Sequence, residues 1–327
     1  MKRATRFLAL LLALGLILFA LAGCAPASPA AAPAPASTAA PAQTPAAAPA
    51  LDTAVSVTDM MGRAVELPAP AARVVAIDAA SCEIVSALGA EAALVGRGEY
   101  CDYPASVQSV PAVQSGNTTN VEQIIALQPQ VVFMNTMAQA SDQVDQLEKA
   151  GIRVVVSTAA DIAGVYASIG LIGACLGKTA EAEALIDGMK ADFDEIRNAV
   201  PAGAAEKSVY FEVSPLEYGL WTAGKDTFMD EIAGMLRLSN SFADVSGWAE
   251  VSQEQVLQRD PDYIVTISMY GGAGPDPVEE ILSRGGWDQL KAVRNKDVYL
   301  VNADELSRPG PRLADGARKI FDIVYGK

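Results

Sequence analysis

Six aromatic side chains lie at the ends of predicted strands or just before a predicted helix, where they could contact a bulky, partly flat ligand. They are Tyr100, Tyr103, Tyr218, Trp221, Trp248 and Tyr270. Ligands of α/β proteins bind outside the carboxyl ends of the strands, and sites for bulky ligands combine aromatic faces with a few polar groups. Each residue alone is more simply explained as an ordinary half-buried aromatic, but the set favours a ligand-binding site.

The chain contains no histidine, which excludes a Ser-His-Asp triad, a Cys-His pair and a histidine-ligated zinc site. No G-x-S-x-G motif is present, and the segment 173–179 is one residue too short for a phosphate-binding loop and follows a helical pattern. An enzyme would have to use carboxylates such as Glu217 and Asp304, which no pattern brings together. We therefore expect no catalytic residues, no cofactor and no metal site built from the protein's own side chains.

The first 23 residues predict a secretory signal. Basic residues precede an uncharged apolar run over residues 8–23, which is shorter than the roughly 20 residues of a membrane-spanning helix. The run ends in Leu21-Ala-Gly-Cys24, which resembles the lipobox of bacterial lipoproteins. The resemblance implies that Cys24 is acylated and becomes the N-terminus; the alternative is an ordinary signal that ends near a cysteine.

Residues 25–50 contain only Ala, Pro, Ser, Thr and Gln. Such a stretch has no side chains with which to build a core, and its prolines disfavour helices. Residues 24–54 are therefore interpreted as a lipid anchor and an extended tether. This organisation predicts a protein on the extracytoplasmic face of the cell membrane.

The other cysteines are Cys82, Cys101 and Cys175. Outside the cytoplasm a pair of cysteines can be oxidised. Cys82 and Cys101 bracket one predicted helix and one predicted strand, so they could meet at one end of a sheet, and we hypothesise a disulfide between them. Cys175 lies in an apolar helical pattern and is interpreted as a small buried hydrophobe.

Composition limits the class of protein further. About 275 residues follow Leu51, enough for one large domain or two lobes, and 51% of the chain is apolar. The chain carries a formal net charge of −15, and its signal holds basic residues but no acidic ones. A folded protein with this much negative charge is a poor partner for nucleic acid or anionic lipid. It would suit a partner with basic patches, although the charge is equally well explained by solubility.

Short apolar strands alternate with helices in two parts of the chain, residues 55–160 and residues 201–327. The predicted strands are 73–78, 93–96, 131–134, 153–156, 208–213, 263–267 and 298–301. The predicted helices are 82–89, 121–127, 138–150, 228–236 and 277–282. This alternation predicts an α/β fold with mostly parallel sheets flanked by helices. Residues 161–200 are predicted to be helical, with a break near Gly177, and to connect the two parts.

The two parts share an internal repeat in which residues 120–133 align with residues 252–265. The identical pairs are Glu122 with Glu254, Gln123 with Gln255, and Pro129 with Pro261. Each unit begins with a residue that caps helices and has Gln three positions later, which predicts a capping box in both. Helix capping accounts for the shared glutamine, and the turn after the helix accounts for the shared proline. For the shared glutamate, helix structure offers only the small stabilisation of an acidic side chain by the helix dipole.

Several motifs together resemble the substrate-binding proteins of ABC importers for ferric siderophores, haem and cobalamin. They are residues 58–68, 100–104, the two glutamate-containing units and residues 307–312. The resemblance covers residues 55–325. It implies two α/β lobes joined by a single long connecting helix, a monomer, and a ligand held in a cleft between the lobes. It also implies that Glu122 and Glu254, one per lobe, dock onto arginines of a permease dimer.

By motif, Tyr100, Trp248 and Asp304 fall on cleft positions of the cobalamin-binding members of this family. Gly116 and Val213 stand where those members have aromatic residues, so two apolar walls are missing. Arg97, Arg308 and Arg312 could instead pair with an anionic siderophore chelate, and Arg312 is equally well explained as a structural ion pair.

The expected function is capture of an iron-siderophore or cobalamin-type chelate and its delivery to an importer. A haem-binding member, a lipid-anchored ligand sensor and an enzyme that uses carboxylates alone are the alternatives. The ligand-binding residues expected are Tyr100, Tyr218, Trp221, Trp248, Tyr270, Asp304 and Arg308.

Overall fold

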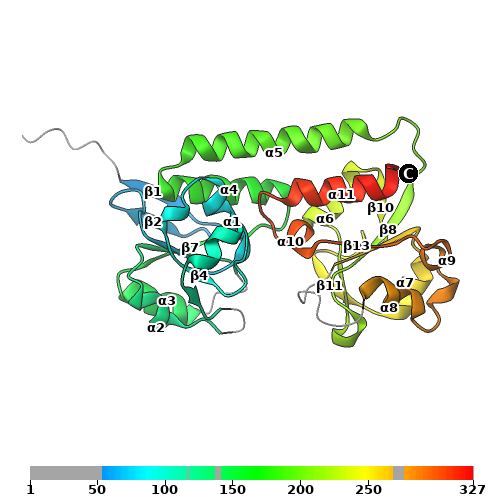
Figure 1. The fold of residues 1–327 in the computed structure, drawn as a ribbon, viewed down its shortest axis with the longest axis horizontal. Helices are drawn as coiled ribbons and strands as arrows, with labels where there is room; N and C mark the ends of the chain where they lie inside the picture. The colour runs from blue at the N-terminus through cyan, green and yellow to red at the C-terminus, as the bar shows by residue number, and fades with distance from the viewer. Residues whose placement is uncertain (1–53, 116–117, 137–140, 268–275, 327) are drawn as a thin grey trace, which may run out of the picture. The chain divides into compact units, whose positions relative to one another are not determined.

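The computed structural model describes residues 54–115, 118–136, 141–267 and 276–326. Two parallel sheets are built from alternating strands and helices, as the sequence predicts (Figure 1). The predicted α/β class is confirmed, and all seven predicted strands are present.

The N-terminal sheet has five parallel strands in the order β5-β4-β3-β6-β7. Its strands are β3 Val74–Ala76, β4 Leu94–Gly98, β5 Ala112–Val113, β6 Val131–Met134 and β7 Arg153–Val156. The helices between them are α1 Ala79–Ala87, α2 Val121–Ala126 and α3 Ser141–Lys149. A hairpin of β1 Val55–Thr58 and β2 Ala64–Leu67 precedes this sheet. Every described residue of β6 is buried, because parallel strands are covered on both faces.

The C-terminal sheet has four parallel strands in the order β10-β8-β12-β13. Its strands are β8 Lys207–Glu212, β10 Leu238–Asn240, β12 Tyr263–Ile267 and β13 Val298–Val301. Its helices are α6 Phe228–Met235, α7 Gln253–Arg259, α8 Pro277–Ser283, α9 Lys291–Asn295, α10 Ala303–Leu306 and α11 Leu313–Tyr325. A separate antiparallel ribbon, β9 Leu220–Ala223 with β11 Trp248–Val251, was not predicted from the sequence.

The predicted connector at residues 161–200 consists of two helices, α4 Ile162–Leu176 and α5 Thr179–Ala199. They pack side by side, with α11 against α5 (Figure 1). Gly177 ends α4 in the left-handed conformation with φ 65°, which favours glycine. The predicted break in the connector is therefore confirmed.

The connector is tied to both halves of the chain. At its start, the Ile162 N–H donates to Glu231 of α6 at 2.8 Å, and the Phe228 N–H donates to the Ala160 carbonyl at 2.8 Å. At the other end of α4, the Ala71 N–H donates to the Cys175 carbonyl at 2.8 Å. One continuous apolar core contains residues of both sheets and of α4, α5 and α11. The two sheets therefore share part of their apolar core with the connector.

Candidate functional site

The aromatic side chains predicted to meet a ligand are unusually exposed for their size. Tyr100 is 68% exposed, Tyr218 58%, Tyr103 47%, Trp248 40% and Trp221 39%. An apolar ring that stays in contact with water gives up the stabilisation of burial, roughly 25 cal/mol per Å². These rings are therefore available to a ligand. Tyr270 lies outside the described residues.

Local structure explains where these rings lie. Tyr100 follows the carboxyl end of β4, whereas Tyr218 closes a 3-10 turn, Leu216–Tyr218, that leads into β9. Trp221 lies in β9, and Trp248 opens β11. The edge of the Phe228 ring packs against Trp248 with centroids 5.5 Å apart, which holds the indole in place. The candidate site therefore draws its aromatic residues from the ends of both halves.

Arg308 is already occupied by carboxylates. Its guanidinium donates to Glu83 at 3.0 Å and to Asp102 at 2.8 Å, and it pairs with Asp304 at 2.7 Å. Burial would lower the pKa of Arg308, but the hydrogen bonds to Asp102 and Glu83 raise it above its usual value. The predicted ligand residues Arg308 and Asp304 thus satisfy one another and hold α10 against the N-terminal half.

Arg312 completes the same network. Its guanidinium donates twice to Glu83, from Nε at 2.9 Å and from Nη2 at 2.7 Å, and stacks 3.9 Å from the centre of the Tyr103 ring. The hydrogen bonds to Glu83 raise the pKa of Arg312. Of the two explanations that the sequence left open, the structure favours the ion pair.

Arg97 is used within the N-terminal sheet. Its guanidinium donates to the carbonyls of Gly98 at 3.2 Å and Cys101 at 3.1 Å. All three arginines that the sequence offered to an anionic ligand therefore have partners inside the protein.

The predicted Cys82–Cys101 disulfide is absent, and this hypothesis is corrected. Both cysteines are free thiols and fully buried. A hydrogen bond between the two thiols, together with burial, raises the pKa of Cys101. The expectation that they meet at one end of the sheet was right, but the covalent bond is not formed. Cys175 is buried as expected, and burial raises its pKa to about 12.

The two glutamates of the internal repeat occupy matching positions. Glu122 lies in the first turn of α2 and Glu254 in the first turn of α7, and both side chains are exposed. Each helix leads into a central strand of its sheet, β6 or β12. The first-turn backbone N–H and the Ser252 hydroxyl lower the pKa of Glu254. Two carboxylates are thus presented at equivalent places on the two halves.

The predicted capping boxes are confirmed for only one of the two helices. In α7, Ser252 accepts from the Gln255 N–H while the Gln255 side chain accepts from the Ser252 N–H. In α2, Asn120 caps the helix, but the Gln123 side chain accepts from the N–H of Gln114 instead. A neighbouring loop therefore overrides the local motif at α2.

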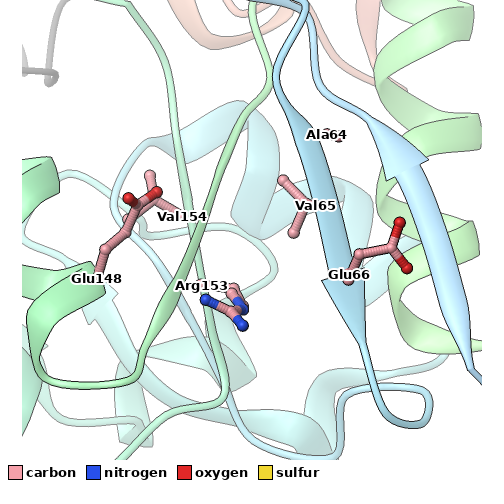
Figure 2. A pocket seen from close by; sticks show the side chains of 6 residues that line it. All are labelled: Ala64, Val65, Glu66, Glu148, Arg153 and Val154. Atoms are coloured by element: carbon pink, nitrogen blue, oxygen red, sulfur yellow. The ribbon is translucent and has the colours of Figure 1, made fainter.

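Other features of the described residues do not add chemistry to this site. No hydrogen bond or other polar contact joins Glu217 and Asp304 in the described part of the chain. A cavity of about 240 Å³ between β2, α3 and β7 is lined by Ala64, Val65, Glu66, Glu148, Arg153 and Val154 (Figure 2). A larger hollow of about 570 Å³ lies between α4, α5 and α6. Neither cavity contains any of the exposed aromatic residues.

Two absences apply to the described ranges alone. Within them, no group of histidine, cysteine or acidic residues could hold a metal ion. In the same ranges, no helix has both the length and the apolar character needed to cross a bilayer.

The sequence did not identify three residues that shape this region, Glu83, Asp102 and Glu250. Glu83 is inside a predicted helix, and Asp102 is inside the 100–104 motif, but neither position indicates a partner more than 200 residues away. Glu250 belongs to the ribbon that the sequence did not predict. Its register opposite Trp221 becomes visible only in the structure.

The chain is similar in sequence to known binding proteins. A sequence model of the family described as "periplasmic binding protein" matches residues 74–305. The ABC transporter substrate-binding lipoprotein YvrC of Bacillus subtilis is 34% identical over 276 residues, 83% of this chain and 85% of YvrC. The vitamin B12-binding protein of Salmonella choleraesuis is 30% identical over 258 residues, 78% of this chain and 90% of that protein.

A solved structure gives the same result for the fold. The crystal structure of a possible iron-binding periplasmic solute-binding protein from Staphylococcus epidermidis is 31% identical and has a TM-score of 0.67. The match covers 78% of this chain and 99% of that one.

Proposed function

Because the chain belongs to the periplasmic binding protein family, we propose that it is a lipid-anchored substrate-binding protein that captures a metal chelate for an ABC importer. The chelate is of the siderophore or corrinoid type, and it binds between the two halves. The observation that carries this proposal is the set of large aromatic rings left exposed at the ends of both halves.

The chemistry of these rings suits such a ligand. A chelate that wraps a metal ion presents broad, weakly polar faces, and these stack well on tryptophan and tyrosine. No protein ligand to the metal is needed, because the chelate supplies the coordination. The relatives named above include a vitamin B12-binding protein and a possible iron-binding protein; the first name supports a corrinoid cargo and the second supports a cargo that contains iron.

Tryptophan fluorescence tests the proposal directly. The chain has three tryptophans, of which Trp221 and Trp248 are half exposed and Trp287 is fully buried. We expect a ferric siderophore or a cobalamin to quench the fluorescence at micromolar concentration. Changing both Trp221 and Trp248 to Phe should remove most of the quenching, while Trp287→Phe should not. Removing the ring altogether, as in Trp221→Ala or Trp248→Ala, should weaken binding by about 1–2 kcal/mol. A flat titration with every chelate would refute the proposed function.

The exposed glutamates support delivery to a permease dimer. One carboxylate on each half would both attract the permease and fix how the two proteins align. The net charge of −15 would steer the encounter with a basic partner. Changing both Glu122 and Glu254 to Arg should abolish uptake in cells while the affinity of the purified protein for its chelate stays unchanged.

Glu279 provides the matched control for this double variant. It is also an exposed first-turn acid, on α8, so Glu279→Arg removes a similar helix-terminal contribution of about 0.3–1 kcal/mol. We expect normal uptake with this control. Normal uptake by the folded double variant would contradict docking.

A further inference from the structure

One face of the β9–β11 ribbon carries two tryptophans and a carboxylate. The antiparallel register places Glu250 directly opposite Trp221, and Trp248 precedes Glu250 by two residues on the same strand. Side chains two residues apart, and those directly opposite, lie on the same face of a sheet. Leu220 and Val251, on the alternate positions, belong to the apolar core. The face with the tryptophans therefore points away from that core.

Glu250 has no fold-stabilising role that its contacts reveal. Its side chain is exposed, and among the residues that the structure describes it makes no hydrogen bond or ion pair. Its Oε1 lies over Gly219, 3.2 Å from the point where a Cβ would be. Gly219 leaves this space open and adopts φ 87°, which favours glycine. The carboxylate is thus held at the start of the ribbon, beside Trp221, with its hydrogen-bonding capacity unused.

Two of the three arginines near the exposed rings are neutralised by carboxylates. Arg308 and Arg312 are paired with carboxylates, whereas Arg97 donates only to backbone carbonyls and keeps its charge. The internal segments outside the described ranges contain no lysine or arginine in their sequence. Lys225 is exposed just beyond β9, where it bridges to Ser246 at the far end of the ribbon from Glu250.

We infer that Glu250 makes the ribbon selective for a chelate that carries hydrogen-bond donors or a positive charge, and that it rejects chelates with carboxylates or other anionic groups. This inference rests on the proposed function. An amide N–H or ammonium group of a ligand stacked on Trp221 would form a charge-assisted hydrogen bond with Glu250. An anionic group in the same place would meet like charge and leave the carboxylate without a partner.

Two classes of chelate satisfy this chemistry. A corrinoid offers many primary amides and no net negative charge. A trihydroxamate siderophore with a free amine offers an ammonium group. Haem, with two carboxylates, and ferric catecholates, with a large negative charge, do not satisfy it. The charge of Glu250 therefore favours corrinoids and amine-bearing trihydroxamates over haem and ferric catecholates, which the aromatic rings alone do not distinguish.

The test compares four chelates on the intact mature protein. Cyanocobalamin and ferrioxamine B represent the accepted chemistry, and haemin and ferric enterobactin represent the rejected chemistry. We expect cyanocobalamin or ferrioxamine B, or both, to bind at least ten times more tightly than haemin and than ferric enterobactin. Glu250→Gln should narrow this ratio by roughly tenfold, because an amide removes the charge and keeps the shape.

Lys225→Gln is the matched control, because it removes one charge from the other end of the same ribbon. We expect it to leave the ratio unchanged. Preferential binding of haemin or enterobactin by the unaltered protein, or the same ratio in Glu250→Gln, would overturn the inference while the proposed function stands. Absence of binding to all four chelates, and to the wider panel of siderophores and cobalamins, would overturn both.

Discussion

Replacing Glu83 by Gln should destabilise the protein more than any change to an exposed ion pair. The Glu83 side chain is 3% exposed and accepts hydrogen bonds from both Arg308 and Arg312. It belongs to α1, whereas the arginines lie on either side of the turn between α10 and α11. The variant keeps the shape of the side chain but removes the charge that neutralises two guanidinium groups.

The size of the destabilisation depends on which contacts Arg308 and Arg312 keep in the variant. Removing one partner of a fully buried ion pair costs about 3–5 kcal/mol. Here Arg308 keeps Asp102 and Asp304, and Arg312 keeps its stack on Tyr103. The arginine side chains are also 16% and 14% exposed, so water reaches them. We therefore expect Glu83→Gln to lower the free energy of unfolding by about 2–3 kcal/mol.

Urea unfolding followed by circular dichroism measures this change. Glu195→Gln is the control, because Glu195 pairs with Arg318 across α5 and α11 but is 71% exposed. Exposed pairs contribute little, so the control should change the free energy of unfolding by no more than about 0.5 kcal/mol. Arg312→Lys should fall between them, because it keeps the charge and loses the two-pronged contact. Equal costs for Glu83→Gln and Glu195→Gln would refute this reasoning.

Three further predictions concern the rest of the chain. Burial alone would raise the pKa of Asp59, but hydrogen bonds from Arg63 and from backbone N–H groups bring it below its usual value. Its stabilising effect is therefore present above the unfolded pKa and lost as pH falls through the folded pKa; Asp59→Asn should cost about 2 kcal/mol at pH 7 and progressively less below pH ~4, as urea unfolding across pH would reveal. A thiol reagent should find no reactive thiol in native acylated protein and three in denaturant, since Cys82, Cys101 and Cys175 are free and buried; a count of one would restore the disulfide. Cys24→Ser should abolish acylation and release the protein from membranes, and a variant that stays in the membrane fraction would argue against the lipid anchor.

Periodicity predicted the main strands and helices because each of these segments obeys one local rule. Strands such as β6 and β12 are continuous apolar runs, which is how buried parallel strands appear in a sequence. The same rules missed β9, β10 and β11, in which exposed residues interrupt the apolar run, and they also missed the helix α11. A strand of three or four residues stands out in a sequence only where it is a continuous apolar run, and the pairing of β9 with β11 is set by contacts with distant parts of the chain.

Some residues of the candidate site could be predicted from the sequence, and others could not. Exposed aromatics near strand ends can be proposed from the sequence, because strand ends are predictable and ring-bearing residues are few. The partners of Arg308 could not be predicted, since Glu83 is 225 residues away. A guanidinium that serves a ligand and one that serves a carboxylate look identical in a sequence. Only the observed pairs show that Arg308 and Arg312 bind carboxylates of the N-terminal half.

Charged residues around the exposed rings therefore fall into two groups: those whose loss should lower the free energy of unfolding and those whose loss should change the affinity for ligands. Glu83 is buried and fully paired, so its loss should reduce stability and leave the choice of ligand unchanged. The Glu250 side chain is exposed and makes no hydrogen bond or ion pair in the described residues, so its loss should change the free energy of unfolding by no more than about 0.5 kcal/mol. A carboxylate that contributes nothing to folding, yet sits on the same face as two half-exposed tryptophans, has its effect only when a ligand arrives. Stability and binding measured on the same two variants would separate the residues that build the protein from those that choose its cargo.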